Sequence, residues 1–400
     1  MKRLGNLYSK VCDLDNLRLA YQKARKGKGG RYGVKLYEKN LERNLLELQK
    51  ELINKTYKTS EYETFLIYEP KEREIFRLPF RDRIVHHAIM NILEPIWVGV
   101  FSYDTFSCIK KRGIHGAEKK LREELSLYPE ETAFCLKLDV RKFYPSIDHD
   151  LLKGVVRRKI KDPDLLWLID GIIDSAPGVP IGNYLSQYLA NLYLAYFDHD
   201  IKSVFGLKFS LRILAVYIPE YVQRSRYTGQ DLEGGRKLSD SELASRFKRS
   251  VNSFRIYIRY ADDIVILSDD KVFLSLLLGW IALYFWNELR LRVKGNWQIF
   301  PVDVRGIDFV GYVTRHKYVL LRKSIKQSFG RKVHKALKKR PTDQTPESLE
   351  RWETEKEKLA HTVSSYYGWC LHCDSIHFFR TIFKLFDDEI KLCIPKAVNL

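Results

Sequence analysis

The chain has few cysteines and lacks a long uninterrupted apolar run. Its six cysteines are scattered over 400 residues, which argues against the dense disulfide framework of a small secreted domain. The N-terminus is basic but no apolar segment follows it, so no signal peptide is predicted. The longest apolar stretch, residues 272–286, is interrupted by Ser275 and is short for a bilayer. We therefore expect a buried helix there and a soluble, cytoplasmic protein with no membrane contact.

The chain also contains few prolines and glycines, 13 and 22 residues, and no internal repeat is visible. These features exclude collagen-like and low-complexity chains. An apolar content of 45% over this length can form two or three folded modules. Acidic residues are outnumbered, because 69 Lys and Arg stand against 50 Asp and Glu, a net charge of +19. Such an excess indicates a polyanionic partner, either nucleic acid or an acidic membrane surface.

Hydrophobic periodicity predicts helices and strands that alternate along the chain. Leucines at helical spacing predict helices within residues 1–60, where the basic, glycine-rich segment 23–35 is either a solvated loop or a phosphate-binding loop. Strands are expected within 62–79 and at 134–140, 255–260, 264–268 and 309–313, and helices at 81–97, 151–173, 186–204 and 272–289. This alternation predicts an α+β or α/β core.

Two segments differ from that body. Residues 215–253 are polar and turn-rich, which indicates an insertion or a surface excursion. Residues 322–340 carry nine basic residues and no acid, and helical patterns follow them to the end of the chain. We expect a separate, basic, helical module there, with a solvated helix face as the alternative.

Three acidic residues carry the most chemical information. Asp262 and Asp263 lie between two apolar strand patterns, where a β-hairpin would hold both carboxylates at its tip. Adjacent anions repel unless a cation lies between them, although a simple turn is the alternative explanation. Asp139 ends another predicted strand on the face opposite Leu136 and Leu138. Together the three acids form a ligand set for two hard cations such as Mg²⁺, a site suited to nucleotidyl transfer.

These motifs resemble those of reverse transcriptases. LDVRKFYPSIDH around Asp139 and YADD at 260–263 are similar to motifs A and C of that family. Further similar blocks are EPKEREIFRLPFRDRIVHHAI (69–89), RGIHGA (112–117), GVPIGNYLSQYLANLYL (178–194), GIDFVGYV (306–313) and SSYYGWCLHCDS (364–375). The last block is similar to thumb sequences of the group II intron-like branch. Seven blocks in order are far more specific than YADD alone.

The resemblance implies an α+β, right-hand polymerase architecture with fingers, palm and a helical thumb. It places an N-terminal extension and fingers at 1–130, the palm at 131–318 with the insertion at about 215–253, and a basic thumb at 319–400. Part of 155–185 would form the junction between fingers and palm.

One block narrows the resemblance to diversity-generating retroelement reverse transcriptases. Most reverse transcriptases have Gln-Gly-x-x-x-Ser-Pro in motif B, whereas this chain has Ile181 and Gln187 in place of the first Gln and the Pro. Retroelement enzymes of this type copy a template-repeat RNA with misincorporation opposite adenine. An isoleucine beside the nascent pair offers only shape and no hydrogen bond, so wrong pairs lose less relative to right ones. Helix packing is the alternative role of Ile181.

The resemblance also implies roles for single residues. Asp139, Asp262 and Asp263 would be catalytic metal ligands for two Mg²⁺, with Mn²⁺ as an alternative, and the Val140 carbonyl would touch one ion. Lys294 would donate a proton to pyrophosphate. The residues expected to bind the incoming dNTP are Lys71, Arg73, Tyr144 (as a steric gate against a ribose 2′-hydroxyl), Ile181, Gly182 and Gln187. Ordinary packing or a solvated position is the alternative at Lys71, Arg73 and Tyr144.

The expected nucleic-acid contacts are basic residues of the fingers and thumb: Arg112, Arg322, Lys323, Lys326, Arg331 and Lys332. Cys370 and Cys373 have zinc-like spacing, but thumb packing explains them better because no second cysteine pair accompanies them.

The implied partners are template-repeat RNA, its RNA/cDNA duplex and a pentameric accessory variability protein. A group II intron-like or phage-defence reverse transcriptase is the alternative, although the chain leaves little room after the thumb for an endonuclease region. A non-catalytic RNA-binding scaffold is the third interpretation, against which three retained acids argue.

Overall fold

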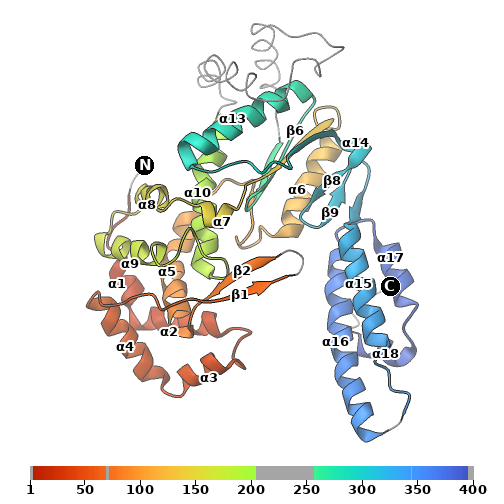
Figure 1. Cartoon of the computed structure of the whole chain (residues 1–400), viewed down its shortest axis with the longest axis horizontal. Helices are drawn as coiled ribbons and strands as arrows, with labels where there is room; N and C mark the ends of the chain where they lie inside the picture. Colours follow the sequence, from red (N-terminus) through yellow and green to blue (C-terminus); the bar gives the residue numbers. More distant parts are fainter. Residues whose placement is uncertain (1–2, 69–71, 204–255, 344, 395–400) are drawn as a thin grey trace. The chain divides into compact units, whose positions relative to one another are not determined.

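The computed structural model describes residues 3–68, 72–203, 256–343 and 345–394 as a mixture of helices and strands (Figure 1). The α+β class expected from the sequence is confirmed over these residues. The expected excursion at 215–253 and the expected dNTP ligand Lys71 lie outside the described residues.

The described residues fall into two compact units, each assembled from segments far apart in the chain. The first unit contains residues up to 109, residues 138–203 and residues 275–297. The second unit contains residues 110–137 and 256–274 and everything from 298 onward.

Helices form most of the N-terminal part of the first unit, as leucine spacing predicted. Asp13 begins the second helix by accepting hydrogen bonds from the N–H groups of residues 15 and 16, at 2.9 and 3.2 Å. In the fourth helix Leu45, Leu48 and Leu52 are buried along one face. The fifth helix packs against the second. These helices are α1 (Tyr8–Cys12), α2 (Leu14–Arg25), α3 (Tyr32–Glu38), α4 (Leu41–Ile53) and α5 (Phe80–Val98).

A two-stranded hairpin precedes α5. Its strands, β1 (Glu63–Ile67) and β2 (Arg73–Arg77), are antiparallel and pair Phe65 with Ile75. The strands expected within 62–79 are therefore confirmed. A two-residue strand, β3 (Thr105–Phe106), follows α5.

The single helix expected over 151–173 is wrong, because two helices occupy this range. After the short α7 (Phe143–Ser146), α8 spans His149–Arg157 and α9 spans Pro163–Ile173. The break has a local cause. Asp162 caps α9 by accepting a hydrogen bond from Leu165 N–H at 3.1 Å, and Pro163 occupies the first helical position, where a missing N–H costs nothing. The apolar periodicity continues across the break and hides it.

Two long helices complete the first unit. They are α10 (Tyr184–Ser203) and α13 (Lys271–Leu289). The first four residues of α13 belong to the second unit. Of the helices among the described residues, only α13 is long and apolar enough to span a bilayer, and 56% of its apolar window is buried. The core helix of a folded unit has the same composition, as expected for residues 272–289.

The second unit contains the main sheet, in which β5, β6, β4 and β7 are neighbours in that order. The strands β5 (Ile256–Tyr260) and β6 (Asp263–Ser268) form an antiparallel hairpin, and β4 (Phe134–Asp139) pairs antiparallel with β7 (Gln298–Pro301). α6 (Ile114–Leu127) packs against β5. The strand β4 itself crosses the division, since its last two residues belong to the first unit.

The single strand expected over 309–313 is also wrong. β8 (Ile307–Phe309) and β9 (Tyr312–Thr314) are separate antiparallel strands joined by a turn at residues 310 and 311. Apolar residues continue through this turn because Val310 packs on the helical core that follows, so alternation alone does not reveal it. β10 (Val319–Leu321) pairs with β9, and α14 (Val302–Arg305) precedes β8.

The C-terminal part of the second unit is a bundle of helices, the secondary structure that the sequence predicted, and its core cluster also includes residues of β9 and β10. Figure 1 shows its helices side by side: α15 (Lys323–Leu337), α16 (Pro346–Cys370), α17 (Ile376–Phe383) and α18 (Asp388–Cys393). Phe329 stacks on Phe379 with ring centroids 5.5 Å apart, and Trp352 and Val363 of α16 are buried in the same cluster.

Candidate active site

The β5–β6 hairpin presents adjacent acids at its tip. Tyr260 and Asp263 form its last pair, so Ala261 and Asp262 make the connecting turn, with Ala261 at φ +55°. A hydrogen bond stabilises this turn, because the fully buried Arg259 donates from Nη1 to the Ala261 carbonyl at 2.7 Å. The sequence prediction of a hairpin with acids at its tip is confirmed, with Asp263 as the first residue of β6.

A lysine from the next strand lies beside the hairpin. Lys137 Nζ of β4 is 3.5 Å from Asp263 Oδ2, and both side chains are about one quarter exposed, at 25% and 29%. Lys137 also donates to the Asp308 carbonyl. An ammonium at this distance offsets the negative charge of the carboxylate.

Asp139 is the last residue of β4, and β4 is the sheet neighbour of β6. Its carboxylate is 29% exposed, and Lys294 Nζ lies 3.1 Å from its Oδ2. The Lys294 backbone N–H donates to the Asp139 carbonyl at 2.8 Å. The expected proton donor Lys294 is therefore the ion-pair partner of the expected metal ligand Asp139.

The backbone after Asp139 forms a short bridge at Val140, a residue that is buried. Val140 and Val293 form an antiparallel bridge, and the flanking hydrogen bonds run from Lys294 N–H to Asp139 and from Arg141 N–H to Arg292. In such a bridge the enclosed residues turn their own N–H and C=O groups away from each other. The Val140 carbonyl therefore faces away from Val293, and its contact with a metal ion stays a prediction.

The groups predicted as metal ligands are of the types that suit hard divalent ions. Three carboxylates and a backbone carbonyl are oxygen ligands of the kind Mg²⁺ prefers. Among the described residues, no three His, Cys, Asp or Glu side chains form a group that could hold a metal ion. Asp139 and Asp263 are instead each near a lysine ammonium.

A second group of predicted residues meets at the segment before α10. The Ile181 carbonyl accepts a hydrogen bond from Phe76 N–H of β2 at 2.9 Å. A Cβ at Gly182 would lie 3.0 Å from the Phe76 carbonyl, so this backbone lies close to the hairpin. The Tyr144 carbonyl accepts from Val179 N–H at 2.9 Å. The structure thus joins the segment of Ile181 and Gly182 to β2 and to Tyr144 of α7.

Two further residues, Arg73 and Gln187, are expected to bind the dNTP. Arg73 is exposed at the start of β2, and Gln187 is partly buried in the first turn of α10. Their assignment as nucleotide ligands remains a prediction.

The expected nucleic-acid contacts gather mostly on α15. Arg322, just before the helix, has Nη2 2.5 Å from Asp308 Oδ1, which fixes its side chain. Lys326 lies over the Phe378 ring at 5.7 Å and Lys332 over the Tyr366 ring at 5.4 Å. Of the other expected contacts, Lys323 and Arg331 are exposed and Arg112 is partly buried.

The cysteine pair of the bundle is engaged in packing. Cys370 is 2% exposed within the cluster around Phe379, and burial raises the pKa of its thiol to about 12. His372 stacks on His115, with ring centroids 4.0 Å apart.

Sequence reasoning missed one group of charged residues beside Tyr144. His149 and Lys153 of α8 contact Asp174 after α9, and His149 also contacts the Gly178 carbonyl. A sequence signal existed for the start of α8, because Asp148 is an N-cap residue and accepts from Leu151 N–H at 3.0 Å. No periodicity links His149 to residues 25 or more positions away.

No protein-family model matches the chain. Over 263 residues it is 25% identical to Group II intron-encoded protein LtrA of Lactococcus lactis subsp. cremoris, covering 59% of this chain and 43% of that protein. Over 218 residues it is 28% identical to Protein YkfC of Escherichia coli (strain K12), covering 50% and 53%. Over 148 residues it is 26% identical to Nuclear intron maturase 4, mitochondrial, of Arabidopsis thaliana, covering 34% and 18%.

The chain therefore spans about half the length, or less, of the curated relatives it matches. Two of these relatives carry intron-encoded or intron maturase names, which agrees with the resemblance to the group II intron-like branch.

Proposed function

We propose that this chain is an RNA-templated DNA polymerase, a reverse transcriptase with right-hand architecture. One observation carries the proposal: the β5–β6 hairpin holds Asp262 and Asp263 at its tip, and β6 is the sheet neighbour of β4, which ends in Asp139. The similarity to Group II intron-encoded protein LtrA supports the same assignment. The net charge of +19 suits a nucleic-acid substrate.

In this proposal Asp139, Asp262 and Asp263, together with the Val140 carbonyl, would hold two Mg²⁺. Two such ions activate the attacking hydroxyl and stabilise the leaving pyrophosphate when they are bound. The chain itself supplies two ammonium groups at the carboxylates. Lys294, which pairs with Asp139, would give a proton to pyrophosphate, and Lys137 would offset the charge of Asp263.

The segment before α10 would define the product. Tyr144 would exclude a ribose 2′-hydroxyl, and Ile181 would contact the nascent base pair through shape alone. Weak discrimination between correct and incorrect base pairs would yield cDNA mutated opposite the adenines of a template-repeat RNA. The accessory variability protein would be the partner of the enzyme. This is the function of a diversity-generating retroelement, and it rests on the residues at 181 and 187.

A group II intron-encoded function is the second candidate, and the comparisons favour it. Two of the relatives named above carry intron-encoded or maturase names, and the alignment with one of them, LtrA, covers 59% of this chain. The DNA beside the gene separates the two candidates: an imperfect repeat pair that differs at adenines supports the retroelement, and intron ribozyme sequence supports the second candidate.

The primary test is primer extension on a defined RNA with dNTPs and Mg²⁺. We expect Asp263→Ala to abolish cDNA synthesis, a loss of about 10³-fold or more, because a lost metal ligand removes several kcal/mol of transition-state stabilisation. RNA binding, measured by filter retention, should remain close to wild type.

Glu130→Ala is the matched control, since it removes an exposed acid from the turn that precedes β4. This variant should extend primers as the wild type does. Undiminished synthesis by Asp263→Ala would remove the metal-ligand assignment, and a wild-type protein that binds RNA but makes no cDNA would favour a non-catalytic scaffold.

A further inference from the structure

Residues 174–182, between α9 and α10, lie wholly within the first unit and carry Ile181 and Gly182. Neighbouring elements fix this segment at several points. Ser175 Oγ lies 2.8 Å from Tyr62 Oη, just before β1. At the other end the Ile181 carbonyl accepts from Phe76 N–H. The segment therefore has its ends fixed by the β1–β2 hairpin region.

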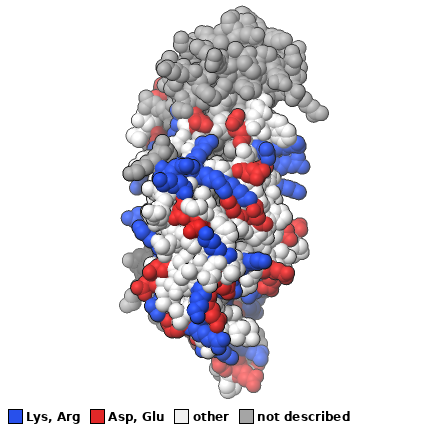
Figure 2. Space-filling view, turned by 90° about the vertical axis from the view of Figure 1, so that its left-hand side faces the viewer, with Lys and Arg blue, Asp and Glu red and all other residues white. Residues whose placement is uncertain are grey.

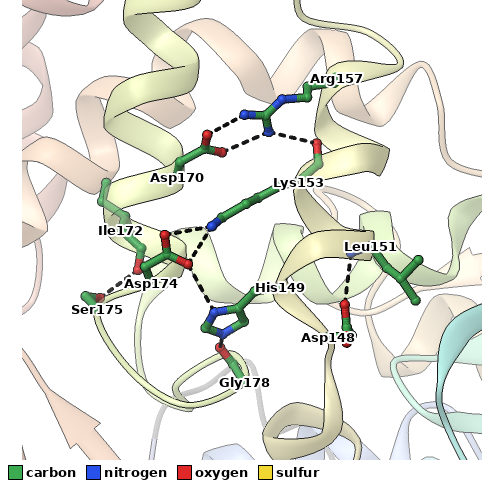
Figure 3. Close-up of polar contacts among 10 residues, drawn as sticks. All are labelled: Asp148, His149, Leu151, Lys153, Arg157, Asp170, Ile172, Asp174, Ser175 and Gly178. Atoms are coloured by element: carbon green, nitrogen blue, oxygen red, sulfur yellow. Dashed lines mark hydrogen bonds and ion pairs between the residues drawn. The ribbon is translucent and has the colours of Figure 1, made fainter.

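Its middle is held by α8 through one imidazole (Figure 3). His149 Nε2 donates to the Gly178 carbonyl at 2.8 Å, and His149 Nδ1 lies 3.2 Å from Asp174 Oδ1. One side chain thus joins residues 174 and 178 and closes the intervening loop. Because the Gly178 carbonyl and an ionised carboxylate can only accept, His149 makes both hydrogen bonds only when both of its ring nitrogens carry a proton.

A lysine on the same face of α8 reinforces this contact. Lys153 Nζ lies 2.6 Å from Asp174, one helical turn from His149 (Figure 3). Burial raises the pKa of Asp174, but the contacts with Lys153 and His149 outweigh it and the net pKa is lowered. Asp174 is therefore ionised near neutral pH and holds both α8 side chains.

The held segment lies directly against Tyr144. A Cβ at Gly178 would be 2.4 Å from the Tyr144 carbonyl oxygen, and Val179 N–H donates to that same oxygen at 2.9 Å. The lack of a Cβ at Gly178 allows this close approach, and the Val179 hydrogen bond joins the two backbones, so we expect a shift of residue 178 to displace the backbone of Tyr144. Ile181 lies only three residues further along the segment.

We propose that His149 is a positioning residue that sets nucleotide discrimination. By joining Asp174 to the Gly178 carbonyl, it fixes the separation of Tyr144 and Ile181, and thus how well the site rejects ribonucleotides. This inference rests on the proposed polymerase function. It adds a specificity role that is independent of the metal ligands.

The test compares kcat/KM for a dNTP and for the matching rNTP in single-nucleotide extension. We expect His149→Ala to lower the preference for dNTP about five- to twentyfold, because small displacements of positioning groups have effects of this size. Asp174→Asn should lower it in the same direction. His149→Gln, which restores a donor for the Gly178 carbonyl, should recover much of the preference.

Arg157→Ala is the matched control, because Arg157 also joins α8 to α9, through Asp170, without contacting residues 174–182 (Figure 3). Its preference should equal that of the wild type. Wild-type preference in both His149→Ala and Asp174→Asn would overturn the inference while wild-type extension still supports the polymerase. If Arg157→Ala lowers the preference equally, general loosening of α8 explains the effect and the inference is also overturned. Absence of any wild-type extension would contradict the proposed function instead.

Discussion

Among single residues, Gly178 lies where the backbone leaves no room for a side chain. Its φ is +60°, and a Cβ there would meet the Tyr144 carbonyl at 2.4 Å and backbone atoms of Pro145 at 2.7 Å. We expect Gly178→Ala to lower the free energy of unfolding by about 2–4 kcal/mol, the sum of left-handed strain and a backbone clash. Urea denaturation followed by circular dichroism measures the change.

Gly154→Ala provides a control of opposite sign. Gly154 is exposed in the interior of α8, and a Cβ there has no neighbour within 4 Å. Alanine in a helix interior is more favourable than glycine by about 0.5–1 kcal/mol, so this variant should be slightly stabilised. Equal destabilisation by both substitutions would show that the close approach at Gly178 is not the cause.

Ile181 offers a second prediction at this scale. Its backbone is fixed by the hydrogen bond from Phe76, so a substitution changes the side chain's chemistry with little change in its place. Ile181→Gln adds an amide that can hydrogen-bond beside the nascent pair. One such bond is worth about 1 kcal/mol, so misincorporation opposite template adenine should fall about five- to tenfold in sequenced cDNA.

Ile181→Val is the matched variant, because it keeps a branched apolar side chain without adding a donor. Its error spectrum should resemble that of the wild type. An unchanged spectrum in Ile181→Gln would assign Ile181 to packing alone.

At the scale of elements, the sequence predicted those helices and strands whose formation depends on neighbouring residues. The β5–β6 hairpin follows from two apolar strand patterns around a turn, and the fully buried Ile258 and Val265 pair across it. The break between α8 and α9 and the turn between β8 and β9 were missed because apolar residues continue through both. Asp162 and Pro163 carried a capping signal that the apolar periodicity concealed.

Contacts distant in sequence set the limit on predicting the candidate site. The hairpin tip and the strand end of Asp139 were predicted as local features, but the lysines beside the acids come from other segments, 126 residues away for Lys137–Asp263 and 155 for Lys294–Asp139. His149 was missed for the same reason, since its partners lie 25 and 29 residues on. Such pairs depend on tertiary packing, which no periodicity encodes.

At the scale of the whole molecule, the net charge of +19 is not one uniform positive surface. On the face drawn in Figure 2, basic side chains are interspersed with acidic ones. Residues 322–340, by contrast, contain nine basic residues and no acid, and much of this stretch forms α15. Electrostatic affinity for a phosphate backbone should therefore depend on where a charge lies, and not only on the total.

This expectation can be tested by the salt dependence of RNA binding. We expect Arg331→Ala, which removes an exposed charge from α15, to reduce the slope of log K against log salt by about 0.7–1, because each phosphate contact releases roughly one counterion. Arg43→Ala is the matched control, since Arg43 is 78% exposed on α4 and paired with Glu47. Both variants lower the net charge by one. If total charge controlled binding, their slopes would fall equally, whereas a fall confined to Arg331→Ala assigns the phosphate contact to α15.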